Sequence, residues 1–124
     1  MNIEVSVGEV LDKISILEIK RKKIKDITKL KNINKEFIAL SESFPNFKDQ
    51  EDYNNLLEIN NTLWDIEDKL RIKESKQSFD TEFIRLARDV YFTNDIRSEI
   101  KKGINIKLGS NLVEEKSYVE YNKI

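Results

Sequence analysis

Apolar side chains recur at intervals of three and four residues along most of the chain, which is the spacing of one face of an α-helix. This pattern predicts three long helices, over about 7–26, 28–44 and 52–74. Two shorter helices are predicted after these, one following Asp80 and one following Thr93. The chain is therefore expected to be helical over most of its length.

Residues that favour helix ends stand where the apolar pattern begins and stops. The stretch 6–9 is a capping box, in which a serine hydroxyl and a glutamate three residues later satisfy free N–H groups at a helix start. Thr28, Asp80 and Thr93 are predicted to cap the second, fourth and fifth helices. Gly109 is expected just past the last helix, where left-handed backbone is needed.

These elements predict an all-α fold, a helical bundle of about five helices built on a long antiparallel hairpin. We expect the first and third helices to form that hairpin. The chain has 124 residues, with three glycines and one proline, which suits a single helical domain over 1–124. The apolar tail from about 110 to 124 is expected to pack on the body or on a partner. Together with a narrow, coiled-coil-like stripe on the second helix, it predicts a homodimer.

The composition excludes several kinds of chemistry. There is no cysteine and no histidine, so we predict no thiolate or imidazole metal site, and we expect no metal and no cofactor. The formal net charge of −1, from 22 basic and 23 acidic residues, provides no overall field for nucleic acid or an anionic membrane. With no signal sequence and no long apolar run, we expect a cytoplasmic protein without nucleic-acid or membrane partners.

Two helices carry charged residues on their predicted buried faces. On an ideal helix, Glu18 and Arg21 project into the apolar arc of the first helix. Asn60, Glu67 and Arg71 project into that of the third. Because isolated buried charges are costly, all four charges are expected to be paired, within or between the helices. The set could be a buried ionic network that sets helix register, or a polar cavity whose arginines bind an anionic ligand.

A second cluster surrounds the predicted junction of the fourth and fifth helices and contains Arg88, Asn94 and Arg97. A helix N-terminus attracts anions, so these residues are further candidates for ligand binding. Asp95 already supplies negative charge at the same place, which favours a simple capped turn with side-chain pairs.

Two pairs of carboxylates, Glu9 with Asp12 and Asp65 with Asp68, are spaced one helical turn apart. Such pairs are typical of metal sites in all-helical nucleotide pyrophosphohydrolases. Neither pair projects squarely onto the predicted core, since Asp12 and Asp68 lie beside the apolar arcs. We therefore do not expect a metal site at either pair.

Four blocks of sequence carry a resemblance along nearly the whole chain: VSVGEVLDKISILEIK, LWDIEDKLR, EFIRLARDVYFTNDIRSEIKKGIN and LGSNLVEEKSY. In this order and spacing they resemble a family of short, uncharacterised bacterial and phage proteins of unknown function. The resemblance implies no catalytic residues. Some relatives occur beside or fused to enzymes that build surface polysaccharide, which implies an accessory role or a sugar-nucleotide partner.

The absence of a complete catalytic pattern or a glycine-rich loop favours a non-catalytic interaction or accessory protein, acting as a homodimer with a possible further protein partner. The alternative is a protein or enzyme that binds a small anionic ligand, such as a nucleotide or sugar phosphate, through the buried glutamates and arginines. In that case it could serve surface-polysaccharide biosynthesis.

Overall fold

The computed structural model describes residues 1–122, so the last two residues of the predicted 110–124 tail lie outside the described part. Within residues 1–122 the structure contains helices and no strands, which confirms the predicted all-α fold. The helices are α1 Val7–Lys23, α2 Ile27–Ser43, the short 3₁₀ helix η1 Phe47–Asp49, α3 Glu51–Ser75 and α4 Thr81–Lys107.

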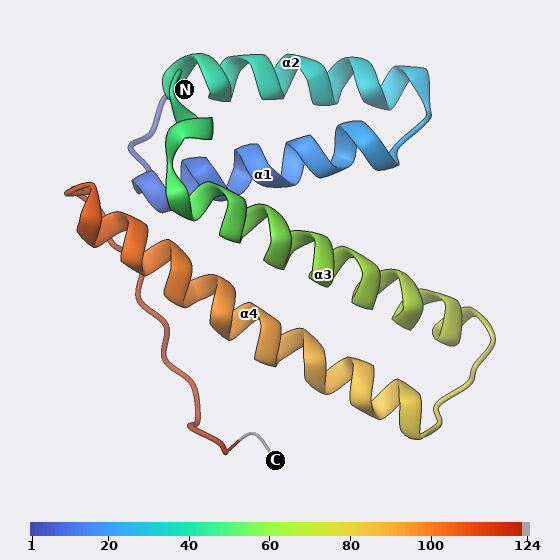
Figure 1. Cartoon of the computed structure of the whole chain (residues 1–124). Helices are drawn as coiled ribbons and strands as arrows, with labels where there is room; N and C mark the ends of the chain where they lie inside the picture. The colour runs from blue at the N-terminus through green and yellow to red at the C-terminus, as the bar shows by residue number, and fades with distance from the viewer. Residues whose placement is uncertain (123–124) are drawn as a thin grey trace.

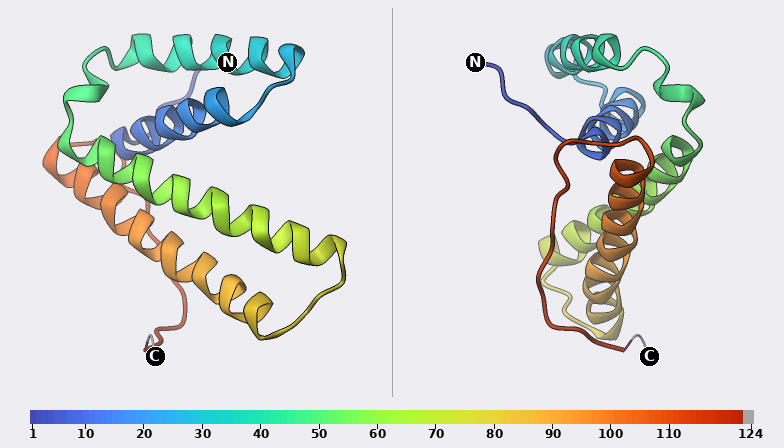
Figure 2. Two further views of the ribbon diagram at one scale, coloured as in Figure 1. Left: turned by 45° about the vertical axis from the view of Figure 1, so that its right-hand side comes forward. Right: turned by 90° about the vertical axis from the view of Figure 1, so that its left-hand side faces the viewer.

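The four α-helices form two antiparallel hairpins, α1 with α2 and α3 with α4 (Figure 1). The hairpins meet at the end where α1 and α3 begin and α4 ends, and they diverge from there (Figure 2). The predicted long antiparallel hairpin is present, but α3 and α4 form it. The expectation that the first and third helices pair in this way was wrong, since α1 and α3 run in the same general direction.

The hydrophobic core lies where the two hairpins meet. Leu11 and Ile14 of α1, Leu56 of α3 and Ile104 of α4 are almost fully buried against one another. Phe47 of η1 packs its ring edge-on to the α3 ring of Tyr53 and closes the core beside α2. This end of the molecule is therefore where polar side chains can become buried.

Side-chain caps define most helix starts. Ser6 accepts a hydrogen bond from the Glu9 amide, and Asp80 accepts one from the Phe83 amide, as predicted. The second helix is capped by Asp26, which the sequence analysis had placed inside the first helix, and the prediction of Thr28 was wrong. Gly109 has a φ of 64°, which confirms the predicted left-handed residue after the last helix.

The predicted fourth and fifth helices are one continuous helix, α4. The prediction of a cap at Thr93 was wrong, because Thr93 is a buried residue in the middle of α4. Threonine, asparagine and aspartate all favour helix starts, but such a cap stabilises a helix by only about 1 kcal/mol, and tertiary contacts override local preferences of this size. Packing along α3, the most extensive contact between helices, keeps the helix unbroken.

After α4 the chain turns back and runs in an extended form along that helix (Figure 2). Ser110 anchors the turn by accepting a hydrogen bond from the Val7 amide at 3.1 Å. Further along, the Tyr121 hydroxyl donates to Asp95, and its ring packs against Phe92. The described part of the tail therefore packs on the body of the same chain.

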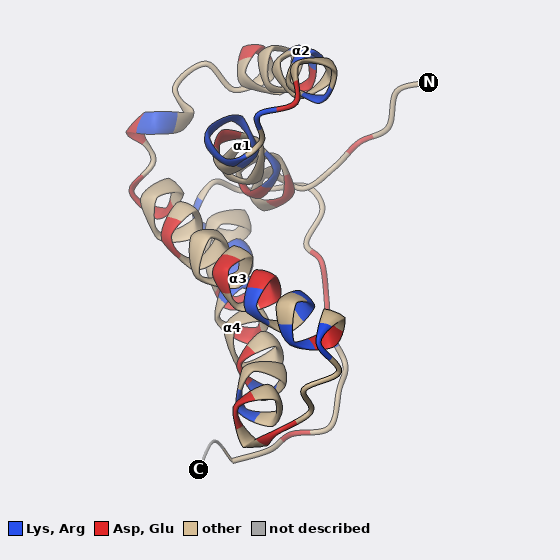
Figure 3. Ribbon diagram, turned by 90° about the vertical axis from the view of Figure 1, so that its right-hand side faces the viewer, with Lys and Arg blue, Asp and Glu red and all other residues tan. Residues whose placement is uncertain are grey.

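Charged side chains of both signs are interspersed along the helices (Figure 3). None of the helices within residues 1–122 is both long and apolar enough to cross a membrane.

Candidate functional site

A buried ion pair joins α1 to α4 at the meeting point of the hairpins. Asp12 is 1% exposed and accepts a hydrogen bond from Arg97 Nε at 2.9 Å through Oδ1, and a second from Nη2 through Oδ2. This two-pronged arrangement matches the planar guanidinium to the carboxylate. The hydrogen bond to Asp12, opposed in part by desolvation, raises the pKa of Arg97 above its usual value.

Helix α3 contributes an amide to the same carboxylate. Asn60 Nδ2 lies 2.9 Å from Asp12 Oδ1 and 2.8 Å from Ser15 Oγ, and donates to both. Ser15 in turn donates to the Asp12 backbone carbonyl at 2.6 Å. The cluster thus links three helices, and each of these three side chains is buried.

Lys101, one turn after Arg97, extends the cluster toward the start of α1. Its ammonium lies 2.8 Å from Glu9 Oε2 and 3.8 Å from Asp12 Oδ2. The tail reaches the same group, since Glu114 Oε1 is 3.9 Å from Lys101 Nζ. Each cation of the cluster therefore faces at least one carboxylate.

Gly8 allows α1 to approach α4 closely enough for these contacts. Its amide donates to Asn105 Oδ1 at 2.6 Å. A Cβ atom at this position would lie 2.6 Å from the Lys101 carbonyl oxygen and 3.0 Å from Asn105 Oδ1. Because the first of these atoms is backbone, a larger residue would push the two helices apart.

The hydrogen-bonding groups of the cluster are satisfied within the protein. Among the described residues, every buried side-chain nitrogen and oxygen has a hydrogen-bond partner. Residues 1–122 also contain no group of three or more acidic side chains placed to hold a metal ion. Arg97, whose side chain is 27% exposed, lines a pocket of about 360 Å³ between α4 and the tail, together with Asn94, Lys101 and Glu114.

The predicted pairing of Glu18 with arginines was wrong. Glu18 is half-buried and accepts a hydrogen bond from the Tyr53 hydroxyl at 3.0 Å. Burial and the nearby Glu18 carboxylate raise the pKa of Tyr53. Arg21 is exposed and stacks its guanidinium over the Phe37 ring, 4.3 Å from the ring centre.

The remaining candidates of the predicted constellation are not buried. Glu67 and Arg71 are exposed on α3 and form no ion pair within the described chain. Their half of α3 lies beyond the point where α1 diverges from it (Figure 1), and both side chains are exposed. Arg88 is exposed on α4, with its guanidinium 5.3 Å from the centre of the Phe92 ring.

Three of the eight predicted residues, Asn60, Asn94 and Arg97, lie together at the cluster; Arg97 Nη1 donates to Asn94 Oδ1 at 3.4 Å. The apolar pattern did not indicate Asp12 as the centre, because Asp12 lies beside the apolar arc of α1. A usable signal was the spacing of Arg97, Lys101 and Ile104, which places two cations and a core residue on one face of α4.

No curated protein and no solved structure matches the chain. The family comparison does find a match, over residues 1–122. The chain therefore belongs to DUF6165, a family of unknown function.

Proposed function

We propose that this protein is a non-catalytic, cytoplasmic interaction protein that associates as a homodimer through the outer face of α4. The observation that carries the proposal is the reversed distribution of side chains over the stretch 96–103 of that helix. Its charged residues Arg97 and Lys101 are turned inward and paired, while Ile96 is turned outward and is 50% exposed. Exposed apolar side chains in one area commonly mark contact surfaces.

The closed character of the cluster supports a structural role for it. A general acid or base needs a group that can reach a substrate, whereas Asp12 is 1% exposed and holds three helices together. In some proteins buried polar networks fix the register of helices and take no part in chemistry, and we assign this role to the cluster.

A second candidate function is the binding of a small anionic ligand, such as a nucleotide or sugar phosphate, in the pocket between α4 and the tail. Arg97 and Lys101 line this pocket, and the tail carboxylate of Glu114 already approaches Lys101 there. An anion could take the place of that carboxylate. Asp12 and Glu9 neutralise the same two cations, which leaves little net attraction.

Light scattering at micromolar concentration tests the leading proposal. We expect the mass of a dimer, and we expect Ile96→Ser to shift the protein toward the monomer. Ile72→Ser is the matched control, because Ile72 is equally exposed on α3, at 53%, and should leave the mass unchanged. A monomeric mass for the unaltered protein would contradict the proposal.

A thermal-shift panel of nucleotides, sugar nucleotides and sugar phosphates tests the second candidate. A rise in melting temperature that disappears in Lys101→Met would favour it, while the absence of any rise across the panel would count against it. The thermal-shift panel tests ligand binding and light scattering tests the dimer, so the result of one experiment does not decide the other.

A further inference from the structure

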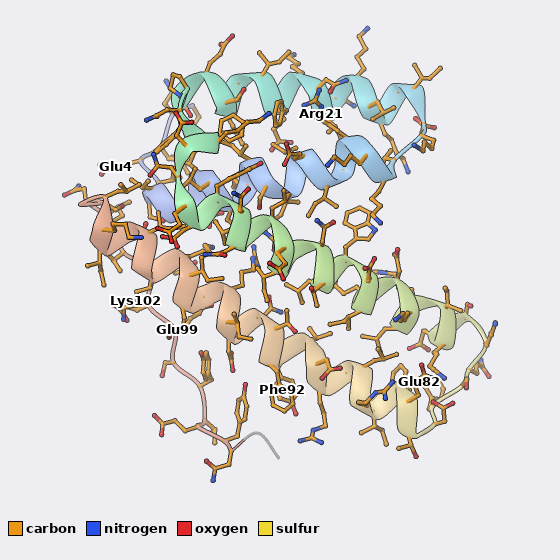
Figure 4. The ribbon with its side chains drawn as sticks, viewed as in Figure 1. Glu4, Arg21, Glu82, Phe92, Glu99 and Lys102 are labelled. Atoms are coloured by element: carbon orange, nitrogen blue, oxygen red, sulfur yellow. The ribbon has the colours of Figure 1, made fainter. Side chains whose placement is uncertain are left out.

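The outer face of α4 carries an apolar groove with charged ends. Ile96, Ile100 and Gly103 line a groove of about 520 Å³, with Asp52 and Lys107 also at its wall. Glu99 lies at the edge of the groove, and Figure 4 shows it on the C-terminal half of α4, on the side away from α1 and α2. A second helix of complementary charge would fit such a groove.

Gly103 is the point at which another helix can approach most closely. It lies inside α4, and a Cβ atom built there would meet nothing within 4 Å. Glycine in a helix interior destabilises the helix relative to alanine, because its backbone loses more conformational freedom on folding. The described part of the chain therefore has room for a side chain at position 103, and its packing does not explain why glycine stands there.

The charges around Gly103 are arranged in a self-complementary way. Glu99, Gly103 and Lys107 are spaced four residues apart, so they form one ridge on the helix surface. Ridges of this kind pack against one another at about −50° in the commonest class of helix contact. If two copies of α4 cross in opposite directions at Gly103, Glu99 of each lies opposite Lys107 of the other.

We propose that the outer face of α4 binds the same face of a second copy of this chain, with the two-fold axis at Gly103 and two Glu99–Lys107 ion pairs across it. This inference rests on the proposed homodimer and adds its register. Ile96 and Ile100 then cover the apolar groove of the partner.

The two charged groups are available for this contact. Glu99 is exposed and makes no ion pair within residues 1–122. Lys107 lies 2.9 Å from Asp52, but its side chain is still 58% exposed. An ammonium group has three N–H donors, so Lys107 can hold Asp52 and a Glu99 carboxylate together.

Charge reversal tests the register directly. Glu99→Lys alone and Lys107→Glu alone each place like charges opposite each other twice, and each should weaken the dimer on the order of tenfold or more. An equal mixture of the two variants should form a heterodimer as tightly as the unaltered protein, because each of the two pairs across the axis then again joins a lysine to a glutamate. The double variant should also recover the dimer.

A cysteine on the two-fold axis gives an independent test, since the chain has no cysteine of its own. Gly103→Cys should form a disulfide-linked dimer under mild oxidation. Arg85→Cys is the control: its side chain is 69% exposed on the same helix but far from Gly103, so it should stay uncrosslinked at the same concentration.

The outcomes separate the register from the dimer itself. A dimeric mass with no effect of charge reversal and no crosslink at Gly103→Cys would overturn the register and leave the homodimer standing. A monomeric mass for the unaltered protein would overturn both.

Discussion

Over residues 96–103, the two faces of α4 reverse the usual arrangement of a helix in a bundle. The inner face presents Arg97 and Lys101 to α1, and both are hydrogen-bonded to carboxylates of that helix. The outer face presents Ile96 and Gly103 to solvent. The difference teaches that the partner of each residue, and not its polarity alone, determines which side of a helix is buried.

The charged cluster on the inner face of α4 is stable only when every charge in it has its partner. Charges removed from water need close partners, and the loss of one partner leaves the other uncompensated. Asp12 receives donors from both α3 and α4, so it is the group on which the set depends most.

Removing Asp12 should have the largest effect. In Asp12→Ala, the partly buried guanidinium of Arg97 and the amide of Asn60 lose their shared acceptor, and we expect the free energy of unfolding to fall by about 3–5 kcal/mol. Urea denaturation followed by circular dichroism measures this. Asp68→Ala, on an exposed part of α3, should change it by less than about 0.5 kcal/mol. Equal effects of the two substitutions would contradict a central role for Asp12.

Exchanging glycine for alanine compares the two faces with one chemical change. Gly8→Ala forces a Cβ against the Lys101 carbonyl, and we expect it to lower the free energy of unfolding by roughly 1–3 kcal/mol. Gly103→Ala meets open space in a helix interior and should raise it by about 0.5–1 kcal/mol. Both are measured at a concentration where light scattering finds monomers, so that association does not contribute. A Gly8→Ala variant at least as stable as the unaltered protein would refute the close approach of α1 and α4.

The smallest effect is expected at the exposed charges of α3. Glu67→Ala and Arg71→Ala should each change the free energy of unfolding by less than about 0.5 kcal/mol, because neither side chain is buried or paired within the described chain. The same denaturation assay applies. A loss above 2 kcal/mol in either variant would mean that this face of α3 is covered, and would revive the buried constellation predicted from the sequence.

Features that depend on neighbouring residues were predicted from the sequence more accurately than contacts between distant residues. The caps at Ser6 and Asp80 and the left-handed Gly109 were predicted from residues a few positions apart, and local hydrogen bonds and backbone conformation determine such features. The candidate site was predicted less well. Asn60 and Arg97 are at the cluster, whereas Glu67 and Arg71 are not.

The physical reason for these errors is that a single apolar arc describes contact with one neighbour. Helix α1 packs against α2, α3 and α4 at once, so it has more than one buried side. Asp12 lies on the side that meets α4, outside the arc of Leu11 and Ile14. The C-terminal half of α3 shows the opposite case. It runs beside α4, but α1 has diverged from it, so the side that carries Glu67 and Arg71 is exposed.

The sequence by itself determined the helical class, most helix ends and the absence of thiol and imidazole chemistry, because these depend on composition and on residues close together in the chain. Only the tertiary structure decided that Thr93 and Asn94, which favour a helix start, lie inside one continuous helix. It also decided that Arg97 pairs with Asp12. Those outcomes depend on how the two hairpins meet, which brings together residues 85 positions apart. The spacing along one helix carries no information about that distant contact.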